Sequence, residues 1–249
     1  MSGRGETSTF AIAGSAGVAV LAYLLVAVTA FRSLGGMPGD LFFVAVQLMS
    51  LPVAWWAMRA LGATRIRSDL TPITESAALA GGLLLAMLAL IGTRPAVGDT
   101  LTFFPAAVLA ALVIAVAEES LFRGALIPLL ARRFGFFPAV VFGAALFGAG
   151  HLQAGIGSGL AAFLVGLALG GLYLRSGLGA CVVFHAAFNI LAGPFFGLHV
   201  GGLPWPGLLE PALSHDPLSS LPVQLGALLL ALWWAPFGVR RGDVRRRAA

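Results

Sequence analysis

Long apolar runs constrain this chain more than any other feature of its sequence. A helix that crosses the hydrocarbon core of a bilayer needs about 20 mostly apolar residues. The chain contains about eight runs close to that length, at residues 9–31, 41–60, 76–92, 101–117, 136–152, 156–174, 179–197 and 221–238. We therefore expect an all-α fold, a polytopic membrane helical bundle with about eight transmembrane helices.

The composition excludes an ordinary water-soluble domain. Hydrophobic residues make up 59% of the chain and charged residues only 10%, whereas soluble domains carry roughly 25% charged residues. No polar stretch is long enough to build a separate soluble core. We expect a single membrane unit with three regions: a three-helix region at 1–100, a core with polar motifs at 101–197, and at 198–249 an outer loop, a last transmembrane helix and a basic tail.

The arginines indicate how the helices are oriented. With eight spans, every arginine falls on one side of the membrane except Arg32 and Arg94, and cytoplasmic loops are enriched in basic residues. This predicts that both termini are cytoplasmic. The first run, preceded by Arg4, has a cleaved signal peptide as its alternative. It is longer than a typical signal core, so we expect a retained anchor.

The net charge of +5 raises nucleic acid as a partner, but no arginine-rich stretch has the interleaved aromatics of a nucleic-acid-binding module. The expected partner is the lipid bilayer, and no nucleic acid. The only cysteine, Cys181, lies in an apolar run and is expected to be a small buried residue. The chain contains no lysine and is rich in alanine and arginine, a composition typical of a bacterium with high GC content. We therefore expect the bacterial cell (inner) membrane.

A few polar residues lie in or next to the apolar runs, where each ionisable group costs about 2.5–3.5 kcal/mol. Glu119 and Arg123 are four residues apart, so on a helix they share a face and can form an ion pair. Glu118 is rotated by about 100° from Glu119 and is free to face another group. The remaining candidates are His151, His185 and Asn189.

The connection at 132–135 predicts a turn between antiparallel helices. Glu118 and His151 lie at similar separations on either side of it, so a hairpin of equal rise would place them level. This requires the helix that begins at 101 to continue well past Ala117. Such a long helix is expected to be tilted, or bent near Pro128.

Three motifs occur in order on separate spans: EExxxR from Glu118 to Arg123, FxxxH from Phe147 to His151, and HxxxN from His185 to Asn189. In this order they resemble the CAAX prenyl protease and bacteriocin-processing (CPBP, Abi) family of intramembrane proteases. The resemblance covers residues 118–189 and implies the residue roles. Glu118 and His151 would activate a water, His185 and Asn189 would stabilise the oxyanion, and Glu119 with Arg123 would support the site.

Metal dependence stays open. The family is often labelled as metalloproteases, and a carboxylate with two histidines suits zinc, which makes Glu118, His151 and His185 the candidate ligands. The sequence has no HExxH motif, so a metal-free, glutamate-activated water is an equal alternative. Ser158 lacks the glycine two positions before the serine that a rhomboid-like GxSG motif needs. No aspartate lies within an apolar span, which argues against a presenilin-like aspartate pair.

Two functions compete at this point. The first is an intramembrane endopeptidase that cleaves a membrane-associated protein or peptide, and the second is a transporter or scaffold that uses the buried polar groups for binding. The family name points to prenylated C-terminal motifs, but a bacterial origin favours another membrane protein or peptide as substrate. His199 and His215 fall in the outer loop, where we expect them to be solvated.

Overall fold

The computed structural model describes residues 48, 50–52, 54–59, 93–95, 100–152, 155–195 and 209–211. Several predictions concern residues outside these ranges: the runs at 9–31, 76–92 and 221–238, both termini, His199 and His215. The run predicted at 41–60 is described only in part, and its described residues, between 48 and 59, are helical.

The described part of the chain is helical, as predicted. Its helices are α4 (Thr100–Glu119), the π-helical segment η1 (Ser120–Leu126), α5 (Ile127–Phe134), α6 (Phe136–His151), α7 (Ile156–Ser176), α8 (Leu178–Ile190) and the π-helical segment η3 (Leu191–Phe195). Among the described residues, two helices are long and apolar enough to cross a membrane, Phe104–Phe134 and Ile156–Ser176. Phe136–His151 and Leu178–Gly193 are apolar but shorter. The total of eight spans stays a prediction.

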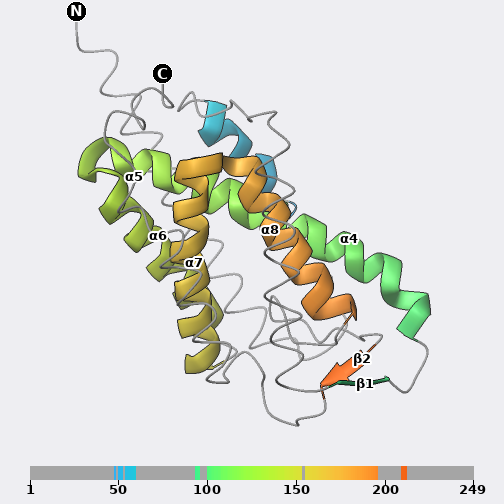
Figure 1. Cartoon of the computed structure of the whole chain (residues 1–249). Helices are drawn as coiled ribbons and strands as arrows, with labels where there is room; N and C mark the ends of the chain where they lie inside the picture. The colour runs from blue at the N-terminus through green and yellow to red at the C-terminus, as the bar shows by residue number, and fades with distance from the viewer. Residues whose placement is uncertain are drawn as a thin grey trace, which may run out of the picture.

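A short antiparallel pair of strands accompanies the helices. β1 (Thr93–Pro95) pairs with β2 (Leu209–Pro211), with Arg94 opposite Glu210. The sequence does not indicate this pair, because a stretch of three residues is too short for an alternating pattern to be recognised. Figure 1 shows the pair beyond the start of α4 and the end of η3.

Helices α4, η1 and α5 follow one another without a break, as the hairpin argument required. The irregular turns lie at η1, just before Pro128 in the first turn of α5. Proline cannot donate a backbone hydrogen bond, and its ring crowds the carbonyl four residues earlier. A wider π-helical turn directly before Pro128 accommodates both effects. The irregularity that we expected near this proline therefore falls on the turns that precede it.

Helix α6 packs along α7, and α8 packs along α4 (Figure 1). Small residues allow the first pair to approach closely. A Cβ atom added to Gly166 of α7 would lie 3.0 Å from the Cα atom of Ala144 on α6, and one added to Gly170 would overlap Val140. The spacing of Gly166 and Gly170 therefore serves packing within the chain.

Two glycines reverse the chain direction between neighbouring helices. Gly135 separates α5 from α6 with φ of 84°, and Gly177 separates α7 from α8 with φ of 86°. Non-glycine residues rarely adopt such positive φ angles. The turn predicted at 132–135 is thereby confirmed.

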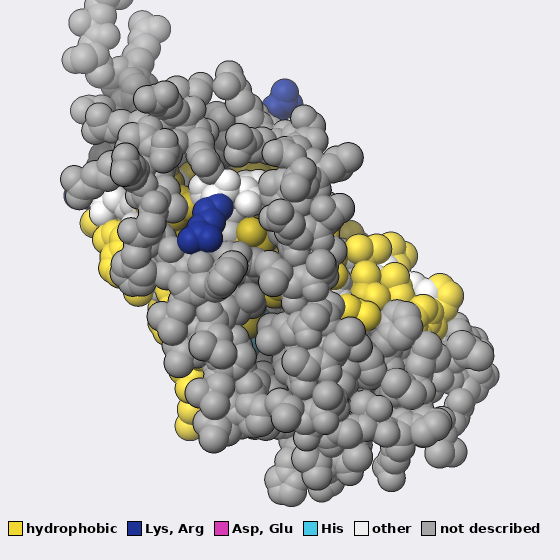
Figure 2. All heavy atoms as spheres, in the orientation of Figure 1, with side chains coloured by type: hydrophobic (Ala, Val, Ile, Leu, Met, Phe, Trp, Pro, Cys, Tyr) yellow, Lys and Arg dark blue, Asp and Glu magenta, His cyan; other side chains and the backbone are white. Residues whose placement is uncertain are grey.

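Apolar side chains cover outer surfaces of the described helices. Leu109, Leu112 and Val116 are exposed at helical spacing on one face of α4, and Phe137 and Phe142 are exposed on α6. Figure 2 shows hydrophobic side chains on the outer surface where α4 emerges at the right of the view. An apolar outer surface suits contact with lipid chains.

Candidate active site

The two adjacent glutamates lie at the junction of α4 and η1. Glu118 is 2% exposed and Glu119 is 0% exposed. A buried carboxylate is costly unless a cation or hydrogen-bond donors compensate it. Their neighbours therefore decide what each carboxylate can do.

Glu119 forms the predicted ion pair with Arg123. The Nη1 atom of Arg123 donates to Oε1 of Glu119 at 2.9 Å, with side chains 1% and 0% exposed respectively. The second guanidinium arm donates through Nη2 to the backbone carbonyl of Gly166 at 3.2 Å. Because Gly166 belongs to α7, Arg123 ties the glutamate segment to that helix.

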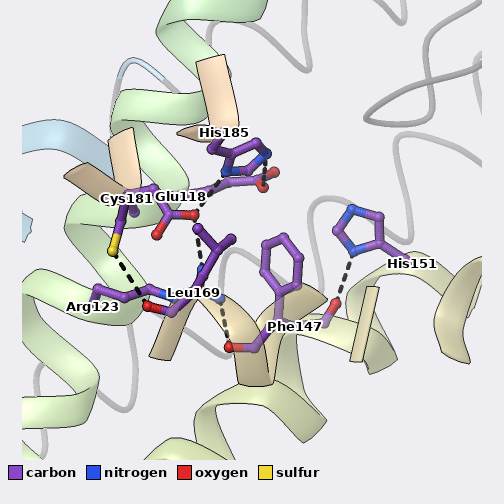
Figure 3. Close-up of polar contacts among 9 residues, drawn as sticks. Glu118, Arg123, Phe147, His151, Leu169, Cys181 and His185 are labelled. Carbon is purple, nitrogen blue, oxygen red and sulfur yellow. Dashed lines mark hydrogen bonds and ion pairs between the residues drawn. The ribbon is translucent and has the colours of Figure 1, made fainter. Parts of the chain in front are cut away.

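His185 of α8 contacts both glutamates. Its Nδ1 atom lies 2.7 Å from Oε1 of Glu119, and its Nε2 atom lies 3.8 Å from Oε2 of Glu118. Figure 3 shows the imidazole next to the carboxylate of Glu118. The sequence alone could not decide whether His185 reaches Glu118, and the structure brings them together.

His151 occupies the last position of α6 and is half-buried. Its Nδ1 atom lies 2.8 Å from the carbonyl oxygen of Phe147, and a carbonyl can only accept, so Nδ1 carries the proton. In the neutral imidazole, Nε2 then keeps its lone pair. His151 is thereby held in the tautomer that can accept a proton at Nε2.

The ring of Phe147 contacts both histidines. Its centroid lies 4.7 Å from that of His151 and 6.0 Å from that of His185, in an edge-to-face arrangement. The guanidinium carbon of Arg123 lies 4.9 Å from the same ring centroid. Figure 3 shows the Phe147 ring between His151 and the group formed by His185 and Glu118. One aromatic ring therefore positions both imidazoles.

Three residues singled out in the sequence lie on helix α8, each one turn from the next. Cys181, His185 and Asn189 are all buried, and their spacing of four residues places them on one stripe of the helix. The thiol of Cys181 donates to the carbonyl of Leu169 on α7 at 3.3 Å. The prediction that Cys181 is a small buried residue is confirmed.

The candidate metal ligands do not form a metal site in this geometry. Among the described residues, no group of three or more His, Cys, Asp or Glu side chains is placed to hold a metal ion. Zinc needs donors at about 2.0–2.2 Å from a common centre. His185 and Glu118 face each other, and Nε2 of His151 keeps its lone pair because Nδ1 bonds to the carbonyl of Phe147. Each side chain can therefore be a ligand by its chemistry, but in the described part of the chain Glu118, His151 and His185 are not grouped closely enough to hold a metal ion.

The structure brings together four of the predicted residues, Glu118, Glu119, Arg123 and His185, and places His151 across the Phe147 ring from them. Asn189 follows His185 by one turn of α8.

Two features of the site were not predicted from the sequence: the bond from His185 to Glu119, and the role of Phe147 beyond its place in a motif. No local pattern indicates a bond between residues that are 66 positions apart. The aromatic residue one turn before His151 was the available signal for Phe147.

Comparison with protein families supports the resemblance indicated by the three motifs. Residues 100–191 match the model of the family described as "Type II CAAX prenyl endopeptidase Rce1-like". The match extends from the first residue of α4 to the first residue of η3 and contains every candidate site residue. No curated protein sequence matches the chain.

Proposed function

We infer that this chain, whose residues 100–191 match the Rce1-like family model, is an intramembrane endopeptidase. It hydrolyses a peptide bond of a membrane-associated protein or peptide. The family is a protease family, which supports a peptidase in general. The match does not favour the transporter and scaffold alternatives.

One observation carries the proposal: His185 lies between the carboxylates of Glu118 and Glu119, at 3.8 Å and 2.7 Å, inside an apolar helical bundle. A carboxylate next to an imidazole can accept a proton and pass it on. Such groups are costly within apolar helices, and they commonly mark a functional site there.

Glu118 and His151 are the groups that activate water in this mechanism. The carboxylate of Glu118 takes a proton from the water while its oxygen attacks the substrate carbonyl carbon. Nε2 of His151, which keeps its lone pair because Nδ1 donates to Phe147, accepts the second hydrogen of the water as a hydrogen bond. The water is thus aligned by one group and deprotonated by the other.

The developing oxyanion needs donors. The proton taken by Glu118 can move to Nε2 of His185, which lies 3.8 Å from Oε2, and the resulting imidazolium donates to the oxyanion. The side-chain amide of Asn189, one turn further along α8, is the second donor. When the tetrahedral intermediate collapses, the C–N bond breaks and the proton returns through Glu118 to the leaving amine.

The substrate class follows from the surroundings of the site. The described helices have apolar outer surfaces, so a peptide that reaches Glu118 must partition into the membrane or be anchored to it. We propose that this chain lies in the bacterial inner membrane and cleaves such a peptide, with or without a prenyl group. A prenylated C-terminal motif is one substrate to test.

The test measures cleavage by the purified full-length protein in bilayer nanodiscs. Three internally quenched peptides serve as probes: a farnesylated CAAX peptide, the same peptide without the farnesyl group, and an unrelated transmembrane peptide. We expect cleavage of at least one of them, and a loss of about 10²-fold or more for Glu118→Gln and for His185→Gln.

Matched controls lie outside the segment that matches the family. Glu210→Gln and His215→Gln make the same chemical changes there and should retain wild-type cleavage. If Glu118→Gln and His185→Gln both fold and also cleave at the wild-type rate, the proposed active site is wrong.

A further inference from the structure

The geometry points to Glu119 as a positioning residue for His185: its Oε1 atom holds the imidazole proton on Nδ1, so that Nε2 is the nitrogen presented to Glu118. This inference rests on the proposed function, because it concerns how His185 takes part in the reaction. It also extends the sequence prediction, in which Glu119 served only as the ion-pair partner of Arg123.

The tautomer follows from the charges. The guanidinium of Arg123 is always protonated and donates to Glu119 at 2.9 Å, which stabilises Glu119 as a carboxylate. An ionised carboxylate can only accept hydrogen bonds. The 2.7 Å contact between His185 Nδ1 and Glu119 Oε1 therefore requires the proton to be on Nδ1.

Fixing Nδ1–H has a consequence on the other side of the ring. In a neutral imidazole the proton on one nitrogen leaves a lone pair on the other. Nε2, 3.8 Å from Oε2 of Glu118, is then free to take up the proton that Glu118 removes from water. In the opposite tautomer Nε2 would already carry a proton, and this transfer would be blocked.

The two oxygens of Glu119 are used unequally. Oε1 accepts from both Arg123 and His185, while Oε2 is buried without a hydrogen-bond partner among the described residues. A carboxylate that only neutralised Arg123 could use both oxygens in a bidentate pair. The convergence of both donors on Oε1 indicates that Glu119 also serves His185.

This asymmetry makes the effect of an amide predictable. In Glu119→Gln, the Arg123 guanidinium requires an acceptor, so the amide oxygen should take the Oε1 position and the NH₂ group the Oε2 position. The amide oxygen would still accept from His185 Nδ1, and the tautomer should be kept. Without Arg123 nothing fixes the amide orientation, and in the double variant Glu119→Gln/Arg123→Met the NH₂ group can turn toward His185 and donate to Nδ1.

Arg123 is itself held in place for this role. Its Nη2 atom donates to the carbonyl of Gly166 on α7, and its guanidinium lies against the Phe147 ring of α6. The order of contacts runs from Gly166 through Arg123 and Glu119 to His185. Helices α7, η1, α4 and α8 thus jointly set the orientation of one imidazole.

The experiment is ¹⁵N NMR of histidine-labelled full-length protein in nanodiscs, with the His185 signals assigned from the His185→Gln variant. Spectra are recorded at several alkaline pH values, and the tautomer is determined from those that carry the signals of a neutral imidazole. We expect Nδ1–H in the wild type and in Glu119→Gln, and loss of the Nδ1–H signal in favour of Nε2–H in Glu119→Gln/Arg123→Met. Cleavage by the double variant should fall about 10²-fold or more in kcat, with KM changed by less than about twofold because no group that binds substrate is altered.

A purely structural role for Glu119 would leave the His185 tautomer unchanged in all variants, and that result would overturn the inference. So would a wild-type protein in which Nε2 carries the proton. The wild type and the double variant each bury no unpaired charge at positions 119 and 123, so their comparison decides the question even if Glu119→Gln alone does not fold. If the spectra are as expected but none of the probe peptides is cleaved, the proposed function fails while the positioning of His185 stands.

Discussion

Replacing Arg123 by methionine tests how strongly the buried charges depend on one another. Arg123 and Glu119 are 1% and 0% exposed and lie 2.9 Å apart. Removing one partner of such a buried pair leaves an uncompensated charge, at a cost of about 3–5 kcal/mol. The lost hydrogen bond to the Gly166 carbonyl costs a further 1.5–3 kcal/mol or so, although methionine recovers part of this by packing.

The assay is equilibrium unfolding of the purified protein in mild detergent, followed as SDS is added. We expect Arg123→Met to lower the free energy of unfolding by at least about 3–5 kcal/mol, the cost of the broken ion pair alone. The control Arg133→Met replaces an exposed arginine of α5. It should change the free energy of unfolding by less than about 0.5 kcal/mol. Adding Glu119→Gln to Arg123→Met removes the stranded charge, so the double variant should regain most of the loss. An Arg123→Met protein within about 1 kcal/mol of the wild type would refute this reasoning, because Glu119 would then not depend on Arg123.

Two further changes test the packing that positions the site. Gly166→Val adds side-chain atoms where a Cβ would already lie 3.0 Å from the Cα atom of Ala144, so it should cost about 1–3 kcal/mol of unfolding free energy. Ile156→Val, at a position that is 83% exposed on the same helix, should cost less than about 0.5 kcal/mol; equal effects would contradict the close approach of α6 and α7. Phe147→Leu removes the ring that contacts both imidazoles and should lower kcat by about tenfold to 10²-fold through misplaced groups. Phe142→Leu, on the exposed side of the same helix, should leave kcat unchanged. An equal loss of kcat in both variants would show that the loss in Phe147→Leu does not come from its contacts with the two histidines.

Local patterns in the sequence were sufficient to predict the helices around the site. The runs predicted at 136–152 and 156–174 correspond to α6 and α7 within two residues at each end, because apolar composition and flanking glycines mark helix limits in a membrane. The spacing of Glu119 and Arg123 likewise predicted their ion pair. Both features depend on residues close to one another in the chain.

Features that depend on contacts between distant segments could not be predicted from the sequence. The π-helical form of η1 depends on how the turns before Pro128 adapt to their neighbours, and apolar composition does not distinguish it from an α-helix. The bond from His185 to Glu119 requires α8 to pack along α4 in one rotational setting. The sequence likewise left open whether Glu118, His151 and His185 could share a metal ion, since that depends on how three separate helices pack.

Cleavage by the Glu118→Gln variant is the most direct test of the central claim, that a buried glutamate next to His185 activates water within a membrane bundle. Single-turnover cleavage of the best probe peptide is measured for this variant and for the wild type in the same nanodiscs, with Glu210→Gln as the control. The account predicts that Glu118→Gln folds, still binds the peptide and cleaves it about 10²-fold or more slowly. Cleavage at the wild-type rate by the folded variant would contradict it.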